Sequence, residues 1–378
     1  MKILHVITGL NDGGAEAVLF RICTNDKRNK HVVISLMDKG KYGRLLQDSG
    51  IITYCLNMPR RRLSFEGVTS LWKYLKKERP DVVQTWMYHG NFVGGLIARL
   101  AGYKEIFWGI HNSNLEVESS AKTTILISKL CVLLSTWVPK RIISCSKKSA
   151  EIHKQMGYCK NKFAVIPNGY DLDQFSPNSE ARLRFRDKWK IPDHLPLLGM
   201  VARFDSQKDH ANLIKALGML KKSGREFRCA LVGTGMNSSN VELVATIQEE
   251  DIENRLLLLG RRPDIPEVMN ALDIHVLSSY GEAFPNVLAE AMSCGTPCVT
   301  TDVGDAALIV GETGWVVPPR DSMALAQAID GAMNEMKDSP KWSQRKISAR
   351  KRISNNFHIE QVLEAYNKEW NTNIYSPQ

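Results

Sequence analysis

The chain has 378 residues, which is long enough for two domains of ordinary size. Hydrophobic residues make up 43% and charged residues 24% of it, a composition typical of a globular protein. The longest apolar stretch, Thr123–Val138, contains Lys129 and is shorter than the roughly 20 residues that a membrane-spanning helix needs. We therefore expect no transmembrane segment in this sequence.

Charge is distributed unevenly along the chain. Residues 1–170 carry 26 Lys and Arg against 12 Asp and Glu, whereas the remainder carries 24 against 28. A basic first half indicates an anionic partner. The eight cysteines include no C-x-x-C pair, and the short apolar start, which contains His5, does not resemble a secretion signal. We expect buried, reduced cysteines and a cytoplasmic location, with the first residues forming a strand.

The first half alternates short apolar runs with helical patterns. The helices include 15–23, 65–77 and 91–100, and this alternation favours a parallel sheet covered by helices on both faces. The strands that we predict here are Ile3–Ile7, Val32–Leu36, Ile51–Tyr54, Val82–Thr85, Ile106–Ile110, Arg141–Cys145 and Ala164–Ile166.

The second half repeats this pattern after a turn-rich segment, 167–196, that we expect to join two domains. A last helix begins near Phe357 and has one apolar face. The sequence thus predicts two doubly wound, Rossmann-like α/β domains, 1–170 and 190–355, with ligands at the carboxyl ends of the strands. The strands predicted in the second domain are Leu197–Val201, Cys229–Val232, Leu256–Leu259, Ile274–Leu277, Cys298–Thr301 and Trp315–Val317.

The most informative stretch is Ser279–Asp302. It runs from the strand Ile274–Leu277 through a loop into a helix that we expect to begin at Pro285. The N-terminus of such a helix offers backbone N–H groups and a positive dipole to an anion. Glu282 and Glu290 flank this end, roughly 12 Å apart or less at 1.5 Å per helical residue. That arrangement suits a nucleotide-sugar, although two glutamates alone are more often a solvated loop acid and an exposed helix position.

The string E-A-F-P-N-V-L-A-E-A-M-S-C-G-T-P-C-V resembles the E-x7-E signature of retaining glycosyltransferases with the GT-B fold, family 4 in particular. The resemblance implies two Rossmann-like domains facing across a cleft, and a final helix, about 357–378, that packs back on the first domain. It implies that the first domain binds the acceptor and the second binds the donor. It also implies transfer of a hexosyl or N-acetylhexosaminyl group with retention at the anomeric carbon. The donor would be a UDP- or GDP-sugar.

The resemblance also implies roles for residues of the second domain. Glu282 would hold the sugar hydroxyls and Glu290 the ribose hydroxyls. Arg203 and Lys208 would contact the donor diphosphate, because two cations suit a diphosphate leaving group. The donor would also meet the helix start and a tight turn after a strand, at Phe284, Asn286, Val287 and Gly233.

In the first domain, Gly13 and Gly14 follow the first strand and resemble the family's Gly-Gly-x-Glu loop, which faces the donor diphosphate. His111 follows the run Ile106–Ile110 and matches the family's histidine that contacts the donor sugar, although a lone histidine is more often packed or solvated. The aromatic and polar cluster Trp86–His89 could line an acceptor pocket or serve interdomain packing.

Two features limit the resemblance. Asp305 stands in the loop where the family has a Gly-Gly pair followed by Glu, which puts the selectivity of that loop in question. Asp171 and Asp173 form a D-x-D that could be mistaken for a metal site, but they lie in the family's linker motif and fit a turn. We therefore expect no catalytic metal and no cofactor beyond the donor.

Basic and aromatic surfaces in the first half indicate a peripheral contact with an anionic membrane. They comprise Arg60–Arg62, the amphipathic helix that follows them and the apolar face of Thr123–Leu134, although a core helix with a basic outer face would look the same. We expect a glycan or a polyprenyl-diphosphate-linked acceptor, used in surface polysaccharide synthesis on the inner face of the cytoplasmic membrane. Nucleic acid is not expected, since no known binding module is present. Alternative functions are a nucleotide-sugar 2-epimerase-like isomerase of the same fold and a non-catalytic nucleotide-sugar-binding protein.

Overall fold

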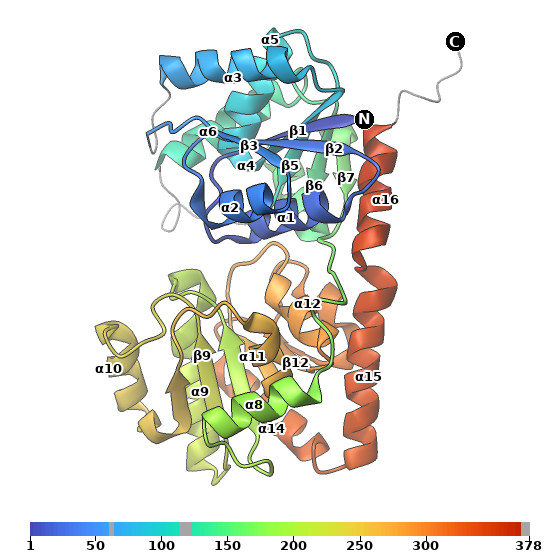
Figure 1. Ribbon diagram of the computed structural model, residues 1–378. Coiled ribbons are helices and arrows are strands. Elements are labelled where there is room, and N and C mark those ends of the chain that lie inside the picture. The colour runs from blue at the N-terminus through green and yellow to red at the C-terminus, as the bar shows by residue number, and fades with distance from the viewer. Residues whose placement is uncertain (60–63, 113–121, 372–378) are drawn as a thin grey trace. The chain divides into compact units, whose positions relative to one another are not determined.

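The computed structural model describes residues 1–59, 64–112 and 122–371. The chain divides into two compact units, one made of Met1–Gly169 with Ile359–Gln378 and the other of Tyr170–His358 (Figure 1). Within the described residues, no helix is long and apolar enough to cross a membrane. The predicted basic run Arg60–Arg62 lies outside the described residues.

The first unit is built on a parallel sheet with the strand order β3-β2-β1-β4-β5-β6-β7. In the centre of the sheet, Val6 of β1 pairs with Ile34 on one side and with Thr85 on the other. The strands are β1 (Lys2–Ile7), β2 (Lys30–Ser35), β3 (Ile52–Cys55), β4 (Val82–Trp86), β5 (Ile106–Ile110), β6 (Arg141–Ser144) and β7 (Phe163–Val165).

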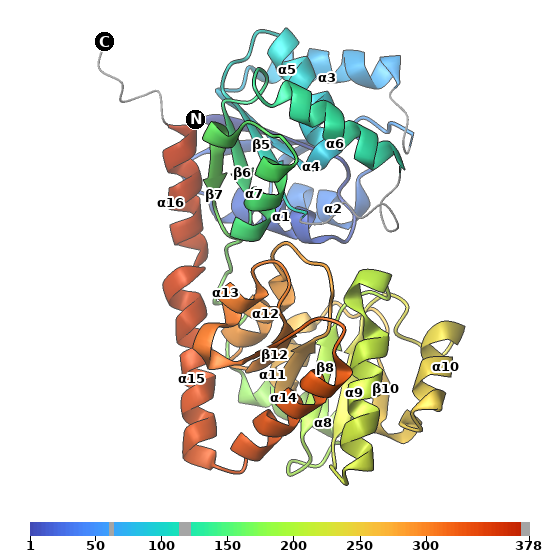
Figure 2. The same ribbon diagram turned by 180° about the vertical axis from the view of Figure 1, so that it is seen from behind.

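Helices cover both faces of this sheet, as the apolar, doubly buried strands require. One core cluster joins the sheet to α1 and α16, and the other joins it to α3, α5 and α6. Figure 2 shows these helices around the sheet. The helices are α1 (Gly14–Asn25), α2 (Gly40–Asp48), α3 (Phe65–Glu78), α4 (Met87–His89), α5 (Gly95–Leu100), α6 (Lys122–Leu134), α7 (Lys147–Gln155) and α16 (Ile359–Trp370), with a π-helical turn at Gly90–Gly94 and a 3₁₀ turn at Lys160–Lys162.

The second unit contains a parallel sheet with the strand order β10-β9-β8-β11-β12-β13. The strands are β8 (Leu197–Val201), β9 (Arg228–Val232), β10 (Leu256–Leu258), β11 (Ile274–Leu277), β12 (Cys298–Thr301) and β13 (Trp315–Val317). The helices are α8 (Ser179–Lys188), α9 (His210–Lys222), α10 (Val241–Glu249), α11 (Ile265–Ala271), α12 (Asn286–Ser293), α13 (Ala306–Val310), α14 (Ser322–Glu335) and α15 (Ser339–Asn356), and 3₁₀ turns lie at Ser206–Lys208, Glu253–Arg255 and Gly311–Thr313.

The two doubly wound parallel sheets confirm the predicted fold class. The predicted turn-rich segment 167–196 was partly wrong, because it contains the helix α8. This helix starts at Asn178, whose side chain accepts the N–H of Ala181. Arg182 and Arg186 then anchor the helix by ion pairs to Asp273. Charged side chains therefore hold α8 in place, and an apolar pattern does not reveal it.

Candidate functional site

The second unit gathers polar side chains where β8 and β11 end. After β11, the hydroxyl of Ser278 donates to the backbone oxygens of Lys208 and Asp209 at 3.0 and 2.9 Å. Lys208 itself ends a 3₁₀ turn, which starts with the side chain of Asp205 accepting the N–H of Gln207. The two loops are thus tied together by hydrogen bonds at the carboxyl edge of the sheet, where doubly wound folds bind ligands.

Glu282 is held at this edge by two donors. Its Oε1 accepts from Nζ of Lys208 at 2.5 Å and from the hydroxyl of Ser279 at 2.8 Å. The Glu282 side chain is only 12% exposed and that of Lys208 only 20%. Charge-assisted hydrogen bonds of this kind are stronger than neutral ones, so the carboxylate has a defined position. The structure therefore brings together two of the predicted site residues.

The loop after β12 supports the backbone of Glu282. Gly304 has a φ of +52°, and a Cβ atom built on it would lie 2.3 Å from the carbonyl oxygen of Ala283 and 2.5 Å from that of Glu282. The backbone N–H of Asp305 donates to the Ala283 oxygen at 3.0 Å, and the Asp305 side chain is buried. Residues 304 and 305 therefore fix the backbone that carries Glu282.

The helix α12 begins one residue later than predicted, because Pro285 is its N-cap and has an extended backbone. Among the described residues, no side chain caps the helix at Pro285, so this end still presents backbone donors. The amide oxygen of Asn286 accepts the hydroxyl of Tyr170 at 2.6 Å. Val287 and Glu290 are half-buried in the first two turns.

Phe284 packs into the interior of the second unit. Its ring meets that of Phe357 edge-on, with centroids 5.6 Å apart, and the residue is 6% exposed. A ligand at this loop can therefore reach the backbone of Phe284 but not the face of its ring.

The other two predicted donor residues lie where β8 and β9 end. Nε of Arg203 is 3.2 Å from a carboxylate oxygen of Asp205, and the Arg203 side chain is 59% exposed. Gly233 has a φ of +145°, and a Cβ there would fall 2.0 Å from the carbonyl oxygen of Ala202. Gly233 thus lets the chain after β9 pass directly beside the chain that leads to Arg203.

Sequence reasoning missed three side chains at this edge. Ser279 and Tyr170 bind Glu282 and Asn286 as described above. Arg320, from the loop after β13, places its guanidinium 4.1 Å from the centre of the Tyr280 ring, and the Tyr280 N–H donates to the Gln207 oxygen. The sequence contains no motif that would connect Arg320 to a loop so far away along the chain.

In the first unit, His111 follows β5 as predicted and is half-buried. Its ring stacks on the indole of Trp86, with centroids 4.9 Å apart and planes 22° from parallel. Within the described residues, its Nε2 atom is buried and has no hydrogen-bond partner. Burial lowers the pKa of His111 to about 4, so the ring is neutral at pH 7. His111 helps to line a small pocket, together with Met87, Tyr88, Gly109, Ile110 and Asn112.

The segment after β4 has an unusual backbone. Met87 has a φ of +62°, a strained value for a residue with a side chain, and the π-helical turn at Gly90–Gly94 follows shortly after it. Trp86 and Tyr88 are buried inside the first unit, where the Tyr88 hydroxyl lies 2.6 Å from Nε2 of His153. Trp86 and Tyr88 therefore pack inside their own unit, a use that differs from both alternatives considered for this cluster, and Met87 and Tyr88 also line the small pocket beside His111.

The glycine loop lies at the start of α1. Gly13 is the N-cap of α1, and a Cβ on it would lie 2.3 Å from a carboxylate oxygen of Glu16. Glu16 is the third residue of the helix, so its side chain folds back over the helix start as in a capping box. The glycine leaves room for that carboxylate.

Asp171 and Asp173, the D-x-D of the sequence, lie in a turn at the start of the second unit. The side chain of Asp171 accepts the backbone N–H groups of Asp173 and Gln174 at 2.9 and 3.3 Å. Its oxygen is therefore used to shape the backbone, as asparagine and aspartate commonly do in turns.

Comparisons with known proteins agree with this architecture. Residues 12–174 match the model of Glycosyltransferase Family 4, and residues 181–349 match that of Glycosyl transferases group 1. The solved structure of HepE from Anabaena with UDP-glucose superposes with a TM-score of 0.86 at 24% identity, covering 98% of this chain and 100% of that one. This similarity confirms the GT-B fold.

Curated relatives extend along most of the chain. The UDP-Gal:alpha-D-GlcNAc-diphosphoundecaprenol alpha-1,3-galactosyltransferase of Escherichia coli is 27% identical over 311 residues, which cover 81% of this chain and 79% of that protein. An N,N'-diacetylbacillosaminyl-diphospho-undecaprenol alpha-1,3-N-acetylgalactosaminyltransferase of Campylobacter jejuni is 26% identical over 306 residues, covering 78% and 79%. Since the two family models together match most of both units, the chain belongs to glycosyltransferase family 4.

Proposed function

We propose that this protein transfers a hexosyl or N-acetylhexosaminyl group from a UDP-sugar to a glycan acceptor carried on a polyprenyl diphosphate. The observation that carries the proposal is the Glu282 carboxylate, fixed by Lys208 and Ser279 beside the start of α12. A carboxylate that accepts sugar hydroxyls, next to cations and helix N–H groups that accept a diphosphate, is the arrangement a nucleotide-sugar needs.

Uridine is favoured as the donor base by two similarities. HepE of Anabaena was solved with UDP and with UDP-glucose, and the Escherichia coli relative uses UDP-Gal. The acceptor is favoured by the names of two relatives, both of which act on sugars linked to undecaprenol through a diphosphate. Such an acceptor suits surface polysaccharide synthesis.

The proposed reaction breaks the bond between the anomeric carbon and the oxygen of the β-phosphate, and UDP leaves with the electron pair. The acceptor oxygen bonds to the same face of the sugar, and its proton goes to the departing phosphate. Arg203, Lys208 and the α12 N-terminus would offset the charge that develops on UDP. Glu282 would hold the sugar, Glu290 the ribose, and Gly233, Asn286 and Val287 would border the donor. No metal ion or other cofactor has a step in this reaction.

The first unit would bind the acceptor, with Gly13 and Gly14 at the start of α1 and His111 in contact with the transferred sugar.

The first unit also carries a surface suited to a membrane. Leu126 and Leu133 of α6 are exposed, as is Trp137 just beyond it, and the guanidinium of Arg99 lies 5.6 Å from the Trp137 ring centre. Apolar side chains flanked by cations are typical of peripheral contact with anionic lipid. We propose that the protein meets the cytoplasmic face of the membrane there.

A donor screen tests this function directly. The protein is incubated with UDP- and GDP-sugars, with and without EDTA, while thermal stabilisation and released nucleoside diphosphate are measured. We expect one UDP-sugar to stabilise the fold and to release UDP when a polyprenyl-diphosphate sugar is added, with EDTA causing no loss.

Other outcomes would favour the alternatives. Conversion of the donor without an acceptor and without UDP release would indicate an isomerase. Stabilisation by a UDP-sugar with no turnover under any condition would indicate a non-catalytic binding protein.

A further inference from the structure

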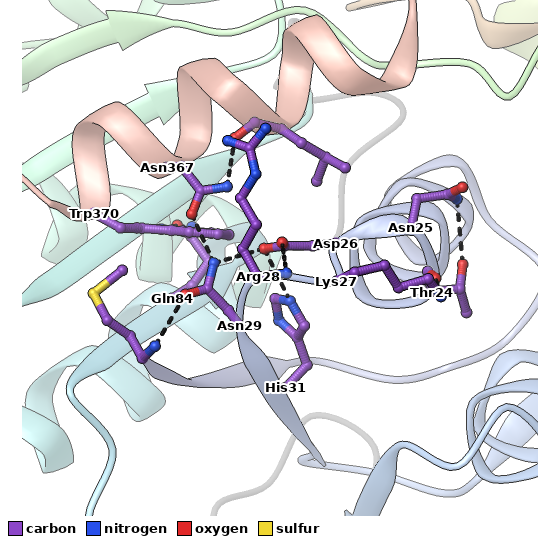
Figure 3. Close-up of polar contacts among 12 residues, drawn as sticks. Thr24, Asn25, Asp26, Lys27, Arg28, Asn29, His31, Gln84, Asn367 and Trp370 are labelled. Carbon is purple, nitrogen blue, oxygen red and sulfur yellow. Dashed lines mark hydrogen bonds and ion pairs between the residues drawn. The ribbon is translucent and has the colours of Figure 1, made fainter.

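A chain of buried polar side chains runs through the interior of the first unit, starting at the indole on which His111 stacks. Nε1 of Trp86 donates to Nδ1 of His5 at 3.1 Å, and Nε2 of His5 lies 2.9 Å from Nδ1 of His31. Nε2 of His31 lies 3.3 Å from a carboxylate oxygen of Asp26. Figure 3 draws this contact as a dashed line between the two side chains. None of the four side chains reaches the surface, since each residue is at most 6% exposed.

The direction of every hydrogen bond in this chain follows from its two ends. An indole N–H can only donate and an ionised carboxylate can only accept. Nδ1 of His5 must therefore be unprotonated, and the proton on its Nε2 points to Nδ1 of His31. By the same reasoning His31 carries its proton on Nε2 and donates to Asp26. Both imidazoles are neutral, and a second proton on either ring would bring two donors face to face.

The same reasoning excludes a metal site here. Among the described residues, His5, Cys23 and His31 form the one group whose candidate ligand atoms all lie within 4.8 Å of one another. A metal ion bound to Nε2 of His5 would force the ring proton onto Nδ1, where the N–H of Trp86 already points. The cluster is better described as a hydrogen-bonded chain with a fixed direction.

The far end of the chain is closed by the C-terminal helix α16. Asp26 accepts from the side-chain amide of Asn29 at 2.7 Å, and that amide also donates to the side-chain oxygen of Asn367 at 2.6 Å. On the same helix, Nε1 of Trp370 donates to the side chain of Gln84 at 3.2 Å (Figure 3). Residues near the two ends of the sequence thus complete one network.

His111 meets this network at the Trp86 indole. Its ring stacks on Trp86, and within the described residues its Nε2 has no partner that would hold the ring from the other side. A shift of the Trp86 indole would therefore change the packing on one face of the His111 imidazole. We propose that the chain Trp86–His5–His31–Asp26, closed by α16, positions the His111 ring for contact with the transferred sugar, so that His5 is a positioning residue. This inference rests on the proposed function for the sugar contact alone.

A double-mutant cycle tests the coupling. His5→Phe keeps a flat ring but removes both hydrogen bonds, and a displaced His111 should lower kcat by about 10- to 100-fold while the donor KM changes little. In a His111→Ala background the same change should cost nothing further, because the residue it acts through is gone. Leu75→Ala, which empties a buried position on α3, is the control for lost stability and should leave kcat unchanged. Equal effects of His5→Phe in both backgrounds would overturn the proposal.

Histidine NMR provides a test that does not depend on activity. In the ¹⁵N-labelled wild-type protein, His5 and His31 should both be protonated at Nε2, and a proton on Nδ1 of His5 would overturn the proposal. In His5→Phe, the titration midpoint of His111 should rise from about 4 towards that of a free imidazole.

The positioning role and the proposed function can fail separately. If the His111 midpoint rises in His5→Phe but the wild type turns over no UDP-sugar, the positioning chain stands and the proposed function fails. If turnover occurs and the cycle is additive, the function stands and the positioning role fails.

Discussion

At the scale of single residues, Gly304 is the glycine on which the Glu282 loop depends. It combines a φ of +52° with a Cβ direction that points at two carbonyl oxygens of that loop. Gly224 offers a matched comparison, because its φ is +79° but no neighbouring atom lies within 4 Å of the place that a Cβ would occupy.

We predict that Gly304→Ala weakens donor binding and lowers the free energy of unfolding by about 1–3 kcal/mol, since strain and a backbone clash act together. Gly224→Ala should cost only the conformational strain, about 1 kcal/mol, and leave donor binding intact. Urea unfolding measures the free energy of unfolding of each variant, and UDP-sugar titrations measure its donor affinity. Equal losses of donor affinity in the two variants would refute a specific role for Gly304.

Glu282 is the residue that most directly tests the site. Glu282→Gln keeps an oxygen for the Ser279 hydroxyl but loses the ion pair with Lys208. We predict a fall in kcat of about 100-fold or more, with UDP affinity nearly unchanged because the carboxylate serves the sugar. Calorimetry with UDP and turnover assays separate the two effects. Glu253→Gln, at an exposed carboxylate of the same unit, is the control and should change neither.

At the scale of secondary-structure elements, two buried histidines should make the second unit sensitive to acid. His275 lies within β11 and His210 opens α9, and no ring nitrogen of either has a hydrogen-bond partner among the described residues. Burial lowers the pKa of His275 to about 3. Burial, with the charge of Lys208, lowers the pKa of His210 to about 4.

Because these pKa values are depressed, the unfolded chain takes up protons first as the pH falls below about 6.5. Stability is therefore complete near pH 7 and decreases towards acid, by about 2 kcal/mol for each histidine at pH 5. Urea unfolding at pH 7 and pH 5 measures this loss, and His275→Leu should reduce it by about 2 kcal/mol. If His275→Leu loses as much stability between pH 7 and pH 5 as the wild type does, the buried His275 is not a source of the acid sensitivity.

The strands of both sheets could be predicted because each is an apolar run between turn residues. Five of the predicted strands begin and end at the same residues as in the structure, for example Ile106–Ile110 and Ile274–Leu277. The helix α8 could not, since Arg182 and Arg186 hold it through Asp273, which lies far along the chain. The family motifs placed Glu282 and Lys208 in one site, but they did not predict the ion pair between them. The contacts of Arg320 with Tyr280 and of Trp86 with His5 follow from the order of strands in each sheet, which no local pattern reveals.

At the scale of the whole molecule, the basic first half and the exposed apolar side chains around α6 predict membrane association. We expect co-sedimentation with vesicles that contain anionic lipid, weakened by salt because the attraction is partly electrostatic. Replacing Leu126 and Leu133 by Asp should abolish it, since both side chains are exposed on α6. Val241→Asp, at an exposed apolar residue of α10, is the matched control. Equal binding by the wild type and the α6 variant would refute this surface.

The central claim is that the protein is a retaining glycosyltransferase, and the configuration of its product tests that claim most directly. The protein is incubated with the UDP-sugar that it binds and a polyprenyl-diphosphate-linked acceptor, and the anomeric proton of the new linkage is observed by NMR. The account predicts an α-linkage from an α-configured donor, with one UDP released for each bond formed. A β-linkage, or no transfer from any nucleotide-sugar that the protein binds, would contradict it.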